Sequence, residues 1–142
     1  MLTKPSLTLK RRLNATPEKV YDAWTDPAKI AGWFGPDGTE VERTEADVRI
    51  DGRYCFMLRD SDCDEHEVSG VYREVIPNEK LVFTWAWKGT PEQVSLVTVL
   101  FKRDGDGTIL TLTHEQLPND ATRDHHREGW TGSLDKLEKL YA

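Results

Sequence analysis

The chain has 142 residues, of which 37% are hydrophobic and 31% charged, a balance that suits a water-soluble domain with its own core. Its 25 acidic residues outnumber its 19 basic ones, and the net charge of −6 argues against a nucleic-acid partner, which needs clustered basic side chains. No apolar run approaches the roughly 20 residues of a membrane-spanning helix, and the amino terminus lacks the apolar stretch of a secretion signal. We therefore expect one domain over residues 1–142, located in the cytoplasm and not inserted in a membrane.

The cysteines and acidic residues match none of the common metal-binding patterns. Cys55 and Cys63 are spaced neither as a CxxC motif nor as a zinc site, and a cytoplasmic chain favours free thiols. The acidic run DSDCDEH at 60–66 resembles the start of a calcium loop but lacks that loop's glycine and closing glutamate. We expect a solvated hairpin loop there, with no metal and no cofactor.

Two short helices are predicted near the amino terminus. Thr16 provides an N-cap, Pro17 suits the first helical position, and Glu18 is an acidic residue in the first turn. Pro27 then ends this helix and begins a second one, which we expect to reach Trp33. The turn-rich sequence FGPDG follows and separates the helices from the strands.

Seven segments have the composition of strands, one before the two helices and six after them. They cover residues 6–13, 40–48, 53–59, 67–76, 81–87, 94–102 and 108–116. The sequence LVFTWAW at 81–87 alternates most clearly, and DGDG at 104–107 predicts a tight turn between the last two strands. Consecutive strands joined by short turns predict an antiparallel sheet.

A long amphipathic helix is predicted for residues 119–142. Five positions recur at spacings of four, four, three and four, which places them on one side of a helix. They are His126, Trp130, Leu134, Leu137 and Tyr141. Asn119 or Asp120 provides the N-cap. Gly129 and Gly132 interrupt the helix, where an interior glycine costs about 1 kcal/mol relative to alanine, so we expect a close backbone approach or an open space there.

The sum of these elements is an α+β fold. We expect a curved antiparallel sheet of about seven strands wrapped around the long C-terminal helix, with the two short helices following the first strand. One helix cannot fill a curled sheet completely, so we expect a cavity between the sheet and the final helix. The glycines and Trp130 would bound that cavity, and the last turns of the helix would anchor it to the sheet.

An ordered set of motifs extends over nearly the whole chain. The segments are TPEKVYDAWTDP at 16–27, GWFGP at 32–36, DVRIDGRY at 47–54, GVYREVIP at 70–77, LVFTW at 81–85, GTILTLTHE at 107–115 and GW at 129–130. This set is similar to the heat-shock-protein-90 ATPase activator homologue family, which belongs to the START-like, birch-allergen-like (SRPBCC) superfamily. The pair Asp51-Gly52 departs from the two glycines that many relatives carry, a change that affects one turn.

The resemblance implies a helix-grip fold, in which a curved sheet holds a long C-terminal helix, usually with an apolar cavity between them. Members of the superfamily bind lipids, sterols, polyketides and other apolar molecules, and some are cyclases or aromatases. Large rings with few polar groups are also the composition expected of a small-molecule site. We therefore expect the ligand-binding residues to be Trp33, Tyr54, Phe56, Phe83, Trp85, Trp87, His114, His126, Gly129 and Trp130. Ordinary core packing is the alternative interpretation for most of these rings.

Three functions are compatible with the sequence. The first is non-enzymatic binding of a small apolar or aromatic molecule, since no catalytic motif is present. The second is an enzyme of the cyclase or aromatase kind, in which His114 or Tyr54 would polarise a bound carbonyl. The third is a protein-interaction module of the co-chaperone type, whose acidic surface would dock a basic partner. A homodimer formed through the edge strands is also compatible with the pattern.

Overall fold

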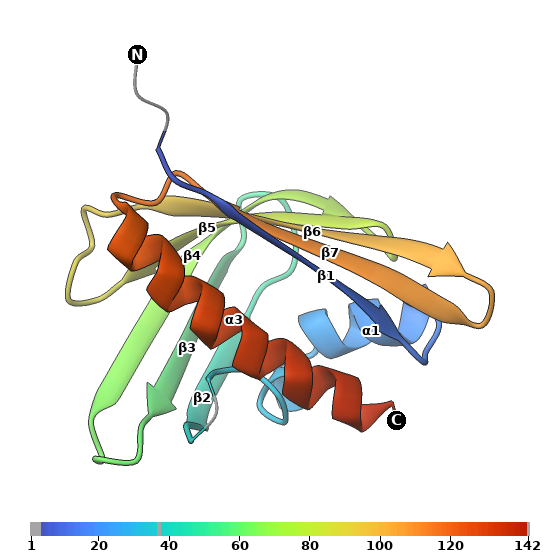
Figure 1. The fold of residues 1–142 in the computed structure, drawn as a ribbon, viewed down its shortest axis with the longest axis horizontal. Helices are drawn as coiled ribbons and strands as arrows, with labels where there is room; N and C mark the ends of the chain where they lie inside the picture. Colours follow the sequence, from blue (N-terminus) through green and yellow to red (C-terminus); the bar gives the residue numbers. More distant parts are fainter. Residues whose placement is uncertain (1–3, 37, 142) are drawn as a thin grey trace.

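A curled antiparallel sheet and a long C-terminal helix dominate the structure, a computed structural model that describes residues 4–36 and 38–141 (Figure 1). In chain order the elements are β1 (Leu7–Leu13), α1 (Pro17–Thr25), α2 (Pro27–Ile30), β2 (Glu40–Ala46), β3 (Arg53–Arg59), β4 (Glu65–Ile76), β5 (Lys80–Trp87), β6 (Ser95–Asp104), β7 (Gly107–Glu115) and α3 (Asp120–Leu140). The predicted α+β order is confirmed, and every predicted strand begins and ends within two residues of its observed bounds. None of the described helices is long and apolar enough to cross a membrane.

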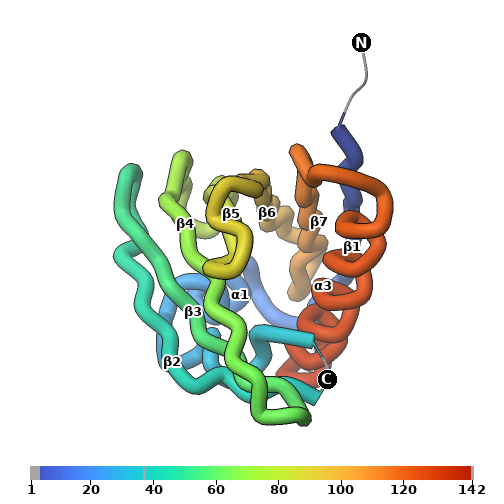
Figure 2. The backbone as a smooth tube through the Cα atoms, turned by 90° about the vertical axis from the view of Figure 1, so that its left-hand side faces the viewer, coloured from blue at the N-terminus to red at the C-terminus, as the bar shows by residue number. Residues whose placement is uncertain are grey.

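The sheet has seven strands in the order β1-β7-β6-β5-β4-β3-β2, and all neighbouring pairs are antiparallel. The first strand therefore joins the last one, and β1 and β2 become the two edges. In profile the sheet curls: β2, β3 and β4 form one side, β7 and β1 form the other, and α3 lies beside β1 (Figure 2). The expected helix-grip arrangement is confirmed.

Two bulges and a glycine bend the strands of the sheet. One extra residue, Glu42, interrupts the β2–β3 register, and another, Arg73, interrupts the β4–β5 register. Between them Gly70 lets β4 approach the carbonyl of Thr84 so closely that a side chain there would overlap it. The Thr84 hydroxyl accepts the backbone N–H of Val71 at 2.8 Å, replacing a ladder bond at the bend. Such irregularities increase local bending, which gives the sheet its concave inner face.

The helix-start signals are confirmed by the capping hydrogen bonds. The Thr16 hydroxyl accepts the N–H of Lys19 at 3.4 Å, and in α3 the Asn119 side chain accepts the N–H of Thr122 at 2.8 Å. The second helix is shorter than expected: α2 ends at Ile30, and the chain turns before Trp33 instead of remaining helical. The predicted end of the last helix at Ala142 lies outside the described residues.

The predicted apolar side of α3 packs on the inner face of the sheet. Trp130, Leu134 and Leu137 are buried, and His126 and Tyr141 at the two ends of this side are half-buried. The inner face of β1 also carries Arg11, whose guanidinium donates to the Asp135 carboxylate of α3 at 2.6 Å. Ser133 fixes the turn after α2, because its hydroxyl accepts the N–H of Gly35 at 3.0 Å.

The helix α3 covers only one part of the concave face. It lies against β1, whereas α1 lies against β6 and β7, and α2 lies against β2. Side chains of the α1–α2 segment and of the turn that follows it also face residues of β3, β4 and β5 on the concave side.

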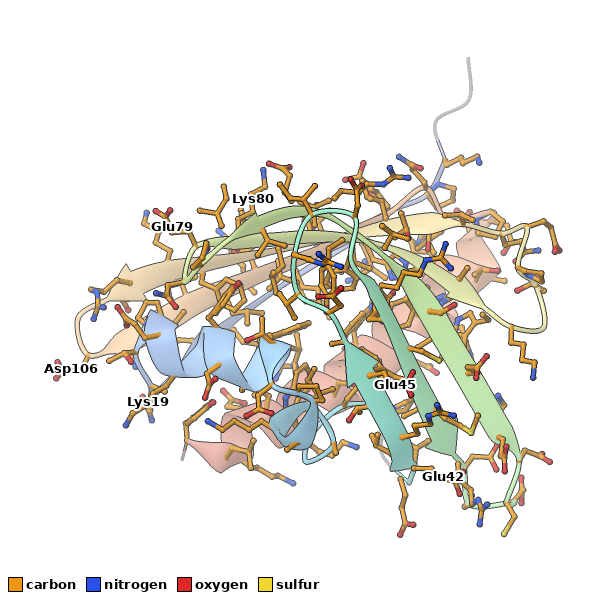
Figure 3. The ribbon with its side chains drawn as sticks, turned by 180° about the vertical axis from the view of Figure 1, so that it is seen from behind. Lys19, Glu42, Glu45, Glu79, Lys80 and Asp106 are labelled. Carbon is orange, nitrogen blue, oxygen red and sulfur yellow. The ribbon has the colours of Figure 1, made fainter. Side chains whose placement is uncertain are left out.

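Charged side chains cover the outer surface and protect the edge strands. Figure 3 shows Lys19, Glu79 and Asp106 pointing away from the molecule. The edge strand β2 exposes Glu42 and Glu45 and contains a bulge, while α3 lies against the other edge strand, β1. Charges, bulges and covering helices all oppose pairing with a further strand.

Gly70→Ala tests the close approach of β4 and β5. The new methyl group would overlap the Thr84 carbonyl oxygen, and because that atom is backbone, the strands would have to separate. We expect the free energy of unfolding to fall by about 2 kcal/mol or more, as measured by urea unfolding. The matched control is Gly89→Ala, where no atom lies within 4 Å of the added carbon. Equal stability of the two variants would contradict the proposed bend.

Candidate functional site

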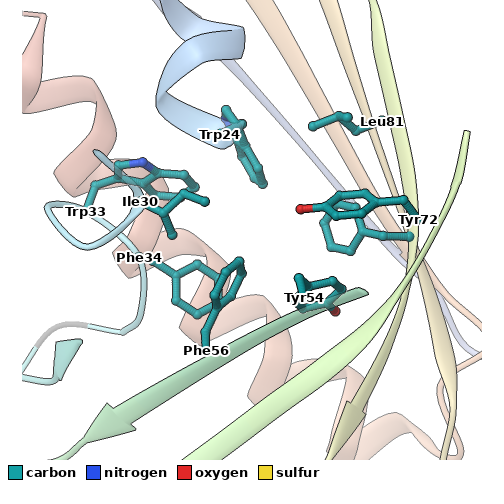
Figure 4. A pocket seen from close by; sticks show the side chains of 9 residues that line it. Trp24, Ile30, Trp33, Phe34, Tyr54, Phe56, Tyr72 and Leu81 are labelled. Atoms are coloured by element: carbon teal, nitrogen blue, oxygen red, sulfur yellow. The ribbon is translucent and has the colours of Figure 1, made fainter. Parts of the chain in front are cut away.

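A small apolar cavity lies between the α1–α2 segment and strands β3, β4 and β5 (Figure 4). Its volume is about 10 Å³, close to the space of a single water molecule. Every lining side chain is hydrophobic, and seven of the nine are aromatic. They are Trp24, Ile30, Trp33, Phe34, Tyr54, Phe56, Tyr72, Leu81 and Phe83.

The helical side of the cavity is held by ring stacking and one hydrogen bond. The Trp33 indole N–H donates to the Ala23 carbonyl at 2.9 Å, which fixes the turn after α2 against α1. Trp24 contacts Trp33 with ring centroids 4.6 Å apart and stacks on Trp130 of α3 at 5.9 Å. Phe34 reaches across the cavity to Phe56 of β3, with ring centroids 4.9 Å apart. These ring contacts join α1, α3 and the turn after α2, and Phe34 connects that turn to β3 of the sheet.

Two of the lining residues are tyrosines, Tyr54 on β3 and Tyr72 on β4. The Tyr54 hydroxyl donates to the Thr84 carbonyl at 2.5 Å, so its proton is already used. The Tyr72 ring lies beside it on β4, with the two ring centroids 5.6 Å apart (Figure 4). Burial raises the pKa of both phenols, so both remain protonated at neutral pH. The cavity therefore presents an apolar surface with no ionised group.

A second cluster, of indole and imidazole rings, lies where the amino-terminal half of α3 meets β5, β6 and β7. The Trp130 indole donates to Nδ1 of His114 at 3.0 Å, and Nε2 of His114 lies 2.7 Å from the Ser95 hydroxyl. An indole nitrogen can only donate, so Nδ1 carries no proton and the neutral ring donates from Nε2 to Ser95. Ser95 in turn donates to the Trp85 carbonyl at 3.3 Å.

His126 repeats this arrangement nearer to the surface. Its Nε2 accepts the indole N–H of Trp87 at 3.0 Å, which leaves the proton on Nδ1, and this N–H donates to the Thr122 carbonyl at 2.8 Å. The rings of His114 and His126 are 4.9 Å apart. Both histidines are therefore held in the neutral form, with each ring nitrogen already bonded.

The geometry opposes proton transfer by these histidines. Burial lowers the pKa of His114 to about 3, with a smaller contribution from His126. Burial also lowers the pKa of His126, with a further lowering from His125. Because Nε2 of His114 donates to Ser95, the imidazole cannot take a proton from that hydroxyl. The Ser95–His114 pair is a structural link between β6 and β7.

The structure divides the predicted site residues between these two clusters. Four of them line the cavity: Trp33, Tyr54, Phe56 and Phe83. Five others form or adjoin the indole–imidazole cluster: Trp85, Trp87, His114, His126 and Trp130. Gly129 belongs to neither cluster and faces Pro36 instead: a side-chain carbon added at Gly129 would lie 3.6 Å from the Pro36 ring.

The expected position of the cavity needs correction. It does not lie beside Gly129 and Trp130, because α3 contributes none of its lining side chains. The large rings of Trp130 and Trp85, 5.0 Å apart, fill the space under that part of the helix. The space lies instead under the α1–α2 segment, where no side chain of α3 lines it.

Five lining residues were not among the predicted site residues. They are Trp24, Ile30, Phe34, Tyr72 and Leu81. Alternation along 67–76 could have indicated Tyr72, which shares the inner face with buried Val68. The role of Trp24 depends on the placement of α1 over the sheet, which no local pattern specifies.

An open groove of about 360 Å³ lies on the outer face of strands β2, β3 and β4. It is lined by Glu45, Arg53, Tyr54, Cys55, Ser69, Gly70 and Val71. Charges of both signs and free access of water distinguish it from the enclosed apolar cavity. Tyr54 lines both, so β3 separates the groove from the cavity.

The acidic loop between β3 and β4 is largely solvent-exposed, as predicted. The carboxylates of Asp60, Asp62 and Asp64 offer oxygens within 4.8 Å of one another. Asp60, however, accepts the backbone N–H groups of Asp62 at 2.9 Å and of Asp64 at 3.0 Å, and pairs with His66 at 2.8 Å. These bonds give the Asp60 carboxylate a role in closing its own loop.

Comparison with known proteins identifies the relatives of this chain. The family described as activator of Hsp90 ATPase homolog 1-like protein matches residues 14–142. A Chromobacterium violaceum structure is 29% identical with a TM-score of 0.88, and it covers 96% of both chains. A Silicibacter pomeroyi structure is also 29% identical, with a TM-score of 0.85 and the same coverage of both chains. CalU16 from Micromonospora echinospora is 26% identical with a TM-score of 0.73, over 96% of this chain and 76% of its own. Among curated proteins, none matches.

Acid should destabilise the protein through His114. Its pKa falls from the ordinary 6.5 to about 3 on folding, so below about pH 6.5 the unfolded state takes up a proton that the folded state refuses. We expect a loss of about 2 kcal/mol of unfolding free energy between about pH 7 and about pH 5 from this group alone. The change is measured by urea unfolding at both pH values.

His114→Asn should remove this loss, because the amide oxygen can still accept from Trp130 but does not titrate. His125→Asn, at an exposed histidine of α3, is the control for the loss of a histidine from the chain. Identical pH dependence in the wild type and the His114 variant would contradict the assignment.

Proposed function

We propose, from the premise that this chain belongs to the activator of Hsp90 ATPase homolog 1-like family, that it binds a small apolar or aromatic molecule without catalysing a reaction. The proposed binding place is the space between the α1–α2 segment and strands β3, β4 and β5. The observation that carries the proposal is the lining itself, in which nine buried hydrophobic side chains face one another. Apolar walls with few polar groups characterise small-molecule sites.

Ligand entry requires the cavity to expand, because about 10 Å³ holds only a water molecule. The strands on one side are held by backbone ladders from β3 to β6, whereas the other side is a four-residue helix, α2, and the turn after it. The tie from this segment to β2 is the Thr44 hydroxyl, which donates to the Pro27 carbonyl at 2.7 Å. We therefore propose that Ile30 and Phe34 move away from β3 to admit the ligand.

Catalysis by His114 or Tyr54, the two candidates from the sequence, has less support than ligand binding. His114 is fully buried with both ring nitrogens bonded, and the Tyr54 proton is donated to Thr84. Neither group is free to polarise a bound carbonyl in this arrangement. A binding role is therefore favoured over a cyclase or aromatase activity.

The partner hypotheses rest on weaker observations. Docking to a chaperone is supported by the family relationship and by the net charge of −6, but by no particular surface feature. A dimer through strand pairing is disfavoured by the charged, bulged β2 and by the helix beside β1. We propose a monomer that binds its ligand alone.

We propose a cytoplasmic location because both cysteines are free thiols. Cys55 pairs with Ser69 inside the sheet, while Cys63 lies in the loop beyond the last β3–β4 pair, Arg59 and Glu65. Four strand residues separate Cys55 from that pair, about 13 Å at the usual rise, which is too far for a disulfide. Two unpaired thiols suit a reducing compartment.

Binding can be tested with an uncharged fluorescent dye such as N-phenylnaphthylamine. Leu81→Phe adds a ring to the cavity lining, where Leu81 is only 1% exposed, and should weaken dye binding about tenfold by filling the space the ligand needs. Leu100→Phe makes the same change on the outer face of β6, where the side chain is 42% exposed, and should leave the affinity unchanged. Thermal unfolding of both variants shows whether they remain folded. The absence of saturable dye binding to the wild type, or equal weakening in both variants, would refute the proposed site.

A further inference from the structure

We infer that Ser133 of α3 controls access to the cavity, because its hydroxyl holds the segment that must move when a ligand enters. This segment, the lid, is the turn at residues 33–36 after α2, and it contributes the lining residues Trp33 and Phe34 (Figure 4). The role rests on the proposed function, since it concerns entry into the same cavity. Ser133 itself lines no part of the cavity and acts through the backbone of the lid.

One side of α3 carries the contacts that hold the lid. The buried Ser133 hydroxyl accepts the N–H of Gly35 at 3.0 Å and donates to the Gly129 carbonyl, also at 3.0 Å. Lys136 donates from Nζ to the Pro36 carbonyl at 3.3 Å. Gly129, Ser133 and Lys136 are spaced by four and three residues, so they share one side of the helix. The lid therefore lies along this side of α3.

The bond to Ser133 must break when Phe34 moves away from β3. The N–H of Gly35 belongs to the planar peptide group that follows Phe34, so the two groups move together. From its length of 3.0 Å, a displacement of about 1 Å takes this bond beyond hydrogen-bonding distance. The rings of Phe34 and Phe56 are 4.9 Å apart, and a ligand between them must separate them by about 3.5 Å, one van der Waals contact distance.

Burial makes this hydrogen bond favour the closed lid. Ser133 is only 2% exposed, so the N–H of Gly35 depends on its hydroxyl while the lid is closed. Once the lid opens, water can satisfy the same N–H. Loss of the hydroxyl therefore leaves a buried donor without an acceptor in the closed state alone. Ser133 thus sets the fraction of open molecules, and the apparent affinity for a ligand rises in proportion to that fraction.

The other bonds of the lid do not oppose this movement. The Trp33 indole N–H donates to the Ala23 carbonyl at 2.9 Å, so this end of the lid stays joined to α1. The Pro36 carbonyl also accepts the Thr39 hydroxyl at 2.6 Å, but both groups belong to the chain that leaves the lid and can move with it. The end of the lid next to Phe34 is therefore the one that α3 holds.

Stopped-flow binding of N-phenylnaphthylamine tests this control of access. We expect Ser133→Ala to raise both the association rate constant and the affinity about tenfold, because the closed lid loses the acceptor for the N–H of Gly35. Lys136→Met removes the second bond from α3, at a half-buried position, and should raise the rate constant about threefold. The matched control is Ser95→Ala, at another buried serine, whose hydroxyl bonds within the indole–imidazole cluster. Its dye association should equal that of the wild type.

Methyl relaxation dispersion of Ile30 tests the lid without a ligand, since Ile30 ends α2 just before the lid and lines the cavity. The population of its minor, open state should rise about tenfold in Ser133→Ala and stay at the wild-type value in Ser95→Ala. An unchanged population in Ser133→Ala, or equal dye association in the two serine variants, overturns the role of Ser133 and leaves the proposed function intact. A larger open population in Ser133→Ala without saturable dye binding to any variant supports the lid and refutes the proposed function instead.

Discussion

The width of the curled sheet is the constraint on which the rest of the structure depends. A concave face of seven strands is wider than the single helix α3, which lies against β1 and reaches β5 at Trp85 and Trp87, so other elements cover β3, β4 and the rest of β5. The α1–α2 segment covers that half with large rings. Rings of fixed shape do not fill a curved surface completely, and the remaining space lies among them.

The two halves of the concave face use their aromatic residues differently. Under α3, the indoles of Trp130 and Trp87 donate to His114 and His126, so these rings are fixed by directional bonds. Under α1 and α2, the contacts between rings are mainly apolar. The rings on the helical side belong to α1 and to the turn after the four-residue helix α2. Apolar contacts can be exchanged for contacts with a ligand, whereas buried hydrogen bonds are costly to break. This difference favours the proposed binding site under α1 and α2.

Most of the fold could be predicted from the sequence, because alternation, capping residues and the DGDG turn are local signals that the structure retains. The lining of the cavity could be predicted only in part. Phe56 and Phe83 were identified because strand alternation places them on the inner face. The position of the cavity was not, because it depends on which helix lies over which strands. Similarly, whether His114 is free or bonded depends on Trp130, sixteen residues away in the chain.

The central claim is that a ligand binds between the α1–α2 segment and strands β3 to β5. Intermolecular NOEs between isotope-labelled protein and bound indane test it most directly. The account predicts NOEs to Ile30, Phe56 and Phe83, which line the cavity on both sides. NOEs confined to Trp87 and His126, or no saturable binding, would contradict it.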